Sequence, residues 1–129
     1  MIAVDTSALV AIVFGEADAE RYLAEVQRSP ARLSAVSLVE SAIVVEARQG
    51  PDAARDLHLL VDATIDVVVP VDDDQAKAAI AAWRRFGRGR HPAGLNLGDC
   101  FAYAVAQLAG VPLLYRGDDF SSTDVASAI

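Results

Sequence analysis

The chain begins with Ile2-Ala3-Val4-Asp5-Thr6-Ser7-Ala8-Leu9-Val10, in which a short β-prone run leads directly into a segment that can form a helix. Asp5-Thr6-Ser7 can cap this helix, and the helix is expected to run to about Phe14 because Gly15 follows. The stretch therefore predicts a strand that passes straight into a helix.

The rest of the chain repeats this alternation. Helices are expected over residues 17–26, 36–48, 52–63, 72–86 and 96–109, and strands over residues 32–35, 66–71 and 111–115. Val67-Val68-Val69 is an unalternated β-branched run, which is typical of a parallel, central strand covered on both faces. The alternation predicts an α/β sandwich with a mainly parallel sheet, formed by one domain over residues 1–129.

The composition fits such a domain in a reducing compartment. The 129 residues are 53% apolar, which favours helices packed on a buried sheet. The longest apolar runs, at residues 7–14 and 101–109, are too short to span a bilayer, so no membrane association is expected. No signal peptide is recognisable at the N-terminus, and Cys100 is the one cysteine; both features predict a cytoplasmic protein.

The charge is unevenly distributed. The net charge of −7 argues against a nucleic-acid partner, since phosphate binding draws on Lys and Arg. However, Arg84, Arg85, Arg88 and Arg90 form a basic cluster in and before a Gly-flanked loop, just ahead of the predicted helix that contains Asp99. This cluster could hold a nucleic-acid backbone by phosphate contacts, or it could be a solvated face.

Acidic residues follow the ends of strands or begin helices at four places. Asp5 follows the first strand and Asp118-Asp119 follows the last, while Glu40 and Asp99 fall in the first turns of predicted helices. Sites in parallel sheets form at the carboxyl ends of strands, so these acids could converge. Each also has a structural explanation as a helix cap, a capping box beginning at Ser37 or Asn96, or a turn residue.

Four segments of the chain resemble the PIN-domain nucleases, and specifically the VapC-type toxins of bacterial toxin–antitoxin pairs. These segments are V-D-T-S-A-L-V at 4–10, S-L-V-E at 37–40, L-N-L-G-D-C-F-A-Y-A at 95–104 and L-L-Y-R-G-D-D-F at 113–120. The resemblance implies a PIN-like three-layer α/β/α sandwich with a mainly parallel central sheet. It also implies a toxin that cleaves structured RNA as an endoribonuclease, is inhibited by a cognate VapB-like antitoxin and forms a homodimer.

By this resemblance Asp5, Glu40 and Asp99 take the positions of the core acidic residues, and either Asp118 or Asp119 is the fourth. Hard oxygen ligands of this kind suit Mg²⁺ or Mn²⁺. We expect Asp5 and Asp99 to be direct ligands, Glu40 to act through water or as a base, and the fourth acid to contact a second metal. The hydroxyls of Thr6 and Ser7 could hydrogen-bond to those carboxylates, or they could only cap the helix.

Three other interpretations are compatible with parts of the sequence. Cys100 could be a nucleophile, although neither histidine is placed by sequence to activate it. A receiver-like phosphoacceptor domain also gathers acids at strand ends, but Lys77 is the only lysine and falls on a predicted helix. The third is a catalytically idle module that binds metal and RNA or protein.

Overall fold

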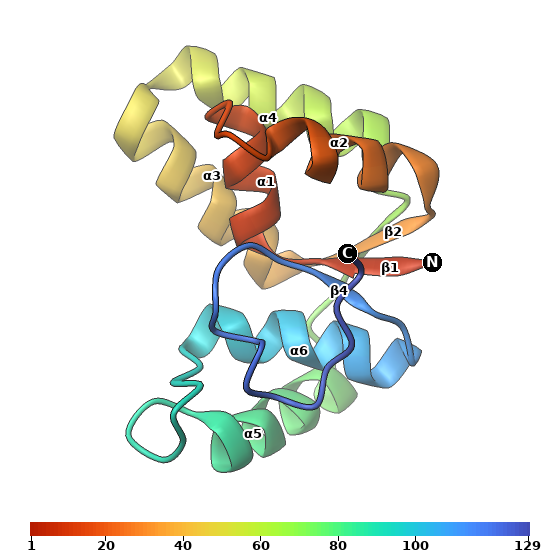
Figure 1. Ribbon diagram of the computed structural model, residues 1–129, viewed down its shortest axis with the longest axis vertical. Helices are drawn as coiled ribbons and strands as arrows, with labels where there is room; N and C mark the ends of the chain where they lie inside the picture. The colour runs from red at the N-terminus through yellow and green to blue at the C-terminus, as the bar shows by residue number, and fades with distance from the viewer.

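The computed structural model describes residues 1–129 as a parallel sheet between two layers of helices. The strands are β1 (Ile2–Val4), β2 (Ala31–Ser34), β3 (Val67–Val69) and β4 (Leu113–Leu114), in the order β3-β2-β1-β4. The helices are α1 (Thr6–Val13), α2 (Ala19–Arg28), α3 (Ala35–Gln49), α4 (Pro51–Thr64), α5 (Asp73–Phe86) and α6 (Leu97–Ala109). Helices α1 to α4 lie on one side of the sheet and α5 and α6 on the other (Figure 1). The predicted three-layer α/β/α sandwich is confirmed.

The sheet separates two hydrophobic cores. Ile2 and Val4 of β1 pack in the core that contains residues of α1 and α4, whereas Ala3 between them packs in the core formed with α5 and α6. Leu114 and Leu113 of β4 divide in the same way. Alternate residues of a strand point to opposite faces, so these short strands are buried on both faces by apolar residues alone.

The strand order places a topological switch point at the carboxyl end of β1. The chain moves from β1 outward to β2 and then β3, and returns to the other side of β1 with β4. Crevices at such a point, outside the carboxyl ends of the strands, are the usual binding sites of open parallel sheets. The segments that follow β1 and β4 meet there, where the backbone N–H of Asp5 donates to the carbonyl of Leu114 at 2.9 Å.

The prediction of a central, fully covered strand at Val67-Val68-Val69 is wrong in two respects. β3 is parallel, as expected, but it is an edge strand that pairs only with β2. Val67 and Val68 are 41% and 40% exposed. β-Branched residues fit a pleated strand whether or not its faces are covered. Pro70, directly after β3, is the better indicator, because proline in sheets is confined to edges and strand ends.

The segment after β4 returns along the sheet. The carbonyl of Ala126 accepts from the backbone N–H of Leu113 at 2.8 Å, and the N–H of Ala128 donates to the carbonyl of Leu113 at 3.0 Å. Farther back, the hydroxyl of Tyr103 donates to Asp124 and thereby fastens the tail to α6. The polar tail expected from the sequence is thus partly paired with the sheet. None of the helices has the length and apolar character needed to cross a membrane.

Candidate active site

Asp5 is both a helix cap and a buried carboxylate with a free oxygen. It follows β1 directly, and its Oδ2 accepts hydrogen bonds from the backbone N–H of Ser7 at 3.0 Å and from the Ser7 hydroxyl at 2.6 Å. Its Oδ1 is buried and has no hydrogen-bond partner. Burying an acceptor without a partner is costly. Capping therefore explains one oxygen of Asp5 and leaves the other without a structural role.

Asp99 forms the predicted capping box at the start of α6. Its backbone N–H donates to Asn96 Oδ1 at 2.8 Å, and its own Oδ2 accepts from the Asn96 backbone N–H at 3.1 Å. The side chain is buried and lines a pocket that it shares with Asp5. As with Asp5, the capping bond orients the carboxylate without excluding it from the site.

Glu40 is not a cap, contrary to the expectation of a capping box at Ser37. α3 begins at Ala35, one residue earlier than predicted, and its N-cap is Ser34, whose hydroxyl accepts from the backbone N–H of Val36 at 3.1 Å. Glu40 therefore lies beyond the first turn of α3. Its side chain lines a pocket and does not cap the helix.

A pocket of about 210 Å³ brings four of the five candidate acids together at the switch point. Asp5, Glu40, Asp99 and Asp119 line it, and Asp118 does not. Thr6, Ser7, Arg48 and Arg116 are also in the lining. We call this the acid pocket. None of its four acids forms an ion pair, although two arginines lie at its edge.

Burial and mutual repulsion raise the pKa values of the two most enclosed acids. Burial raises the pKa of Asp5 to about 6; the hydrogen bonds from Ser7 oppose this rise, and the charge of Glu40 adds to it. Burial raises the pKa of Asp99 to about 7, with the Asn96 hydrogen bond opposing and the charges of Asp5, Asp119 and Glu40 adding. The pocket therefore holds more negative charge than its surroundings stabilise, and a bound cation would relieve it.

The donor set of the acid pocket fits a hard divalent cation. It consists of carboxylate oxygens, one of them the buried, unpartnered Oδ1 of Asp5, and Mg²⁺ and Mn²⁺ prefer such ligands. As they stand, no three Asp, Glu, His or Cys side chains are grouped closely enough to hold an ion. Binding would therefore require the carboxylates to turn towards one point.

The two hydroxyls that follow Asp5 have different roles. Ser7 Oγ donates to Asp5 and accepts from the backbone N–H of Arg116 at 2.9 Å, so it links the loop after β4 to the first acid. The Thr6 hydroxyl donates instead to the carbonyl of Ser37 at 3.2 Å and ties α1 to α3. The expected bond to a carboxylate is present for Ser7 and absent for Thr6.

The predicted basic cluster lies outside the acid pocket. Arg85 forms an ion pair with Asp124 at 3.2 Å, and the guanidinium of Arg90 lies 4.5 Å from the centroid of the Trp83 ring. Arg84 and Arg88 are exposed. Two of the four arginines are thus engaged by neighbouring side chains.

The acid pocket contains two arginines that the sequence did not single out. Arg116 pairs with Glu16 at 2.6 Å and Asp18 at 3.0 Å, whereas Arg48 has no ion pair and lies 5.7 Å from the ring centroid of Phe14. Arg116 directly follows the strand predicted at residues 111–115, which is a positional signal in the sequence. Nothing in the sequence marked Arg48.

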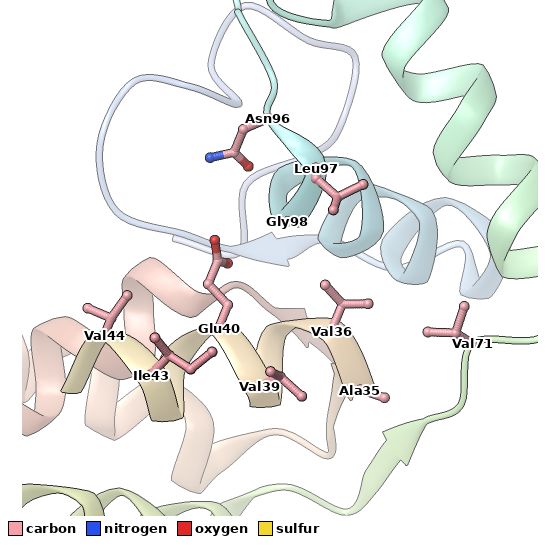
Figure 2. A pocket seen from close by; sticks show the side chains of 10 residues that line it. All are labelled: Ala35, Val36, Val39, Glu40, Ile43, Val44, Val71, Asn96, Leu97 and Gly98. Carbon is pink, nitrogen blue, oxygen red and sulfur yellow. The ribbon is translucent and has the colours of Figure 1, made fainter. Parts of the chain in front are cut away.

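An apolar groove of about 700 Å³ adjoins the acid pocket and shares Glu40 with it. Figure 2 shows the groove between α3 and the start of α6, with Glu40 extending from α3 across its end. Val39, Ile43 and Leu97 line it and are largely exposed, Leu97 at 74%. Apolar residues so close together on a surface commonly mark an interaction site.

Two alternatives from the sequence are not supported at this site. Cys100 is buried, and burial, with the charge of Asp99 adding, raises the pKa of its thiol to about 11, so it is not a thiolate nucleophile at neutral pH. Lys77 pairs with Asp73 on the surface of α5, at 2.7 Å, and does not reach the acids as a receiver domain would require.

Comparison with known proteins gives consistent matches over nearly the whole chain. The family model described as PIN domain matches residues 2–126. Ribonuclease VapC30 of Mycobacterium tuberculosis is 50% identical over 125 residues, which are 96% of this chain and 95% of that protein. Ribonuclease VapC of Mycolicibacterium smegmatis is also 50% identical, over 96% of this chain and 97% of its own length.

Two solved structures have the same fold. The sarcin-ricin loop cleaving toxin VapC20 of Mycobacterium tuberculosis superposes with a TM-score of 0.78 at 21% identity, covering 98% of this chain and 97% of that one. A chain of a toxin–antitoxin complex from Klebsiella pneumoniae superposes with a TM-score of 0.72 at 20% identity, covering 100% and 98%. At such identities the likeness supports the fold alone.

Proposed function

Since this chain belongs to the PIN domain family, and within it to the VapC ribonucleases, we propose that it is a metal-dependent endoribonuclease that hydrolyses phosphodiester bonds in structured RNA. Residues 1–129 would form its single nuclease domain. It would act in the cytoplasm, where such RNA is found, as a toxin held in check by a cognate VapB-like antitoxin. One observation carries the proposal: four carboxylates without ion pairs share one pocket at the switch point of the sheet.

The proposed cofactor is Mg²⁺ or Mn²⁺. Asp5 and Asp99 would hold the ion directly, Glu40 would act through water or as a base, and Asp119 would contact a second ion. When bound, the metal would supply Lewis-acid chemistry, lowering the pKa of a water and offsetting negative charge at the scissile phosphate. Asp119 is preferred to Asp118 as the fourth acid because only Asp119 lines the acid pocket.

The chain's own contribution is to hold these oxygens in place. Ser7 has a single hydroxyl proton, and it donates that proton to Asp5 Oδ2 while the N–H of Arg116 occupies its acceptor side. These hydrogen bonds hold the Asp5 carboxylate in one orientation and leave its Oδ1 available. The capping box fixes Asp99 in the same manner. With Asp5 and Asp99 held by these bonds, fewer side chains have to reorient when an ion binds, which reduces the cost of assembling the site.

RNA would be held by cations around the acid pocket. Arg84 and Arg88 remain candidates for phosphate contacts because both are exposed and form no ion pair. Arg85 and Arg90 would contribute less, since neighbouring side chains already engage them. Phosphate contacts position the substrate and make its affinity fall with salt.

The test is a cleavage assay with purified protein and total RNA. Cleavage should require Mg²⁺ or Mn²⁺, stop when EDTA is added and resume when the metal is restored. Asp5→Asn should also abolish cleavage. Asparagine keeps the shape of the helix cap and removes the charge, so a loss of activity would not come from a lost cap. Cleavage that persists in excess chelator, or that survives in Asp5→Asn, would reject the proposed mechanism.

We also propose a homodimer that buries the apolar groove and its surroundings. Ile43 of α3 and Leu97 of α6 are exposed apolar side chains of the groove, and Leu97 also lines an adjoining pocket with the exposed Trp83 of α5. Ile43→Glu should yield a monomer in light scattering after size-exclusion chromatography. Leu59→Glu, at an exposed apolar residue of α4, is the matched control and should leave the dimer intact. A wild-type monomer, or an Ile43→Glu dimer, would contradict this assignment.

A further inference from the structure

Gly98 lies where a side chain would collide with the carboxylate of Glu40. A Cβ built at Gly98 would be 2.6 Å from each carboxylate oxygen of Glu40 and 2.8 Å from its Cδ. These are the three nearest atoms, so a side chain at position 98 would first meet the carboxylate of Glu40. Figure 2 shows Glu40 extending from α3 towards the start of α6, where Asn96, Leu97 and Gly98 lie. Gly98 is the second residue of α6.

The backbone does not require glycine at this position. Gly98 is in the first turn of α6 and is not among the glycines with positive φ, unlike Gly110, which ends the same helix. Alanine is preferred to glycine in a helix, since glycine loses more conformational freedom. Helix formation therefore favours a side chain at position 98, and the contact with Glu40 is the feature that opposes one.

The contact places the Glu40 carboxylate beside the start of α6. Glu40 lies on the boundary between the acid pocket and the apolar groove, and it lines both. The start of α6 carries the positive end of the helix dipole, which favours a carboxylate at that point. A methyl group at position 98 would force the flexible end of Glu40 away from α6, and the backbone would have no need to move.

We infer that Gly98 is a positioning residue for the metal site: its missing side chain keeps the Glu40 carboxylate against α6 and within the acid pocket. Gly98 touches neither substrate nor metal, and it acts only through Glu40. The inference rests on the proposed function, because it assumes that Glu40 contributes to metal binding.

The test measures Mn²⁺ binding to RNA-free protein by calorimetry, together with RNA cleavage. Gly98→Ala should fold and, without metal, should melt no lower than wild type, because alanine favours the helix. Its Mn²⁺ affinity should fall by about 10-fold or more, the usual effect of disturbing groups that orient metal ligands. Cleavage should fall in parallel.

A double-mutant cycle shows whether Gly98 acts through Glu40. Glu40→Ala removes the carboxylate that a side chain at position 98 would displace. Adding Gly98→Ala to Glu40→Ala should therefore change neither Mn²⁺ affinity nor cleavage further. A purely structural role would give the same loss in both backgrounds.

The outcomes separate this inference from the function on which it rests. If wild type binds no Mn²⁺ or Mg²⁺, the proposed function fails and the inference fails with it. If wild type binds Mn²⁺ and Gly98→Ala binds it equally well, only the inference is overturned. An effect that persists in the Glu40→Ala background, or a metal-free Gly98→Ala protein that does not fold, also overturns it.

Discussion

Replacing Asp99 with asparagine should stabilise the metal-free protein at pH 8. Asparagine keeps an oxygen for the capping bond from the Asn96 N–H and removes the charge that Asp5, Glu40 and Asp119 repel. Burial, together with that repulsion, raises the pKa of Asp99 from 3.8 to about 7. The folded state therefore binds more protons than the unfolded chain between about pH 4 and pH 7, and the free energy of unfolding falls as pH rises through this range.

The size of the effect follows from that pKa. The full penalty of ionising Asp99 in the folded protein corresponds to about 4 kcal/mol above pH 7, and screening by water in the open pocket reduces it to about 2 kcal/mol. The weakened interaction with the helix dipole opposes this by about 0.3–1 kcal/mol. The net stabilisation should be about 1 kcal/mol or more, which for a chain of this size raises Tm by roughly 3–5 °C.

The assay is a set of melting curves at several pH values, in EDTA and in Mn²⁺. The gain in Asp99→Asn should disappear below about pH 4, where Asp99 is protonated in the folded and the unfolded protein alike. Mn²⁺ should stabilise wild type by binding the folded state, and the asparagine variant should show little of that stabilisation. Asp72→Asn is the control, because Asp72 only caps α5, accepting from the Gln75 N–H at 2.9 Å, and should show no such gain.

An Asp99→Asn protein that melts lower than wild type at pH 8 in EDTA, keeps its Mn²⁺ stabilisation and still cleaves RNA would contradict a role in metal binding. That result would show that Asp99 acts as a helix cap and not as a metal ligand. In EDTA the sign of the change in Tm separates the two roles, because repulsion and capping act in opposite directions.

The acid pocket, the exposed arginines and the buried thiol each support a further prediction. Asp119→Asn should lower cleavage of labelled RNA by about 100-fold or more, as removal of a metal ligand would, while Asp118→Asn should stay within a few-fold of wild type. Replacing Arg84 and Arg88 with alanine should reduce the slope of log affinity against log salt by about one for each phosphate that is no longer bound; an unchanged slope would assign both to the solvated surface. Burial raises the pKa of the Cys100 thiol to about 11, so a thiol reagent at pH 8 should modify native protein slowly and urea-unfolded protein readily.

The order of helices and strands could be predicted because local signals mark their ends. The helix expected at residues 36–48 is observed as Ala35–Gln49, and the one at 52–63 as Pro51–Thr64, with Gly50 and Pro51 marking the boundary between them. The position of a strand within the sheet is different, because it depends on contacts between distant segments. Val67-Val68-Val69 therefore predicted a strand correctly, but the predicted central position was wrong, because β3 is at the edge of the sheet.

The candidate site could be predicted as a set of acids but not as a set of contacts. Asp5 and Asp99 are marked by their places after a strand and at a helix start, which the sequence contains. The choice between Asp118 and Asp119 depends on the path of the loop after β4, and the contact between Glu40 and Gly98 depends on how α3 packs against α6. Neither is encoded in local sequence, because each depends on tertiary packing.

Capping and metal binding are compatible roles for the same carboxylate. An ionised carboxylate has two oxygens with about four acceptor positions, and a helix cap uses only part of that capacity. At Asp5, Ser7 occupies Oδ2 and leaves Oδ1 buried and free. The cap restricts the rotation of the side chain, so the remaining oxygen is held at the carboxyl end of β1 before any ion arrives. A metal-free protein must tolerate that unpartnered oxygen, and the raised pKa of Asp5 is the measurable sign of this cost. Removing the Ser7 hydroxyl should therefore release Asp5 and weaken Mn²⁺ binding, while Ser7→Thr, which keeps a hydroxyl, should retain it.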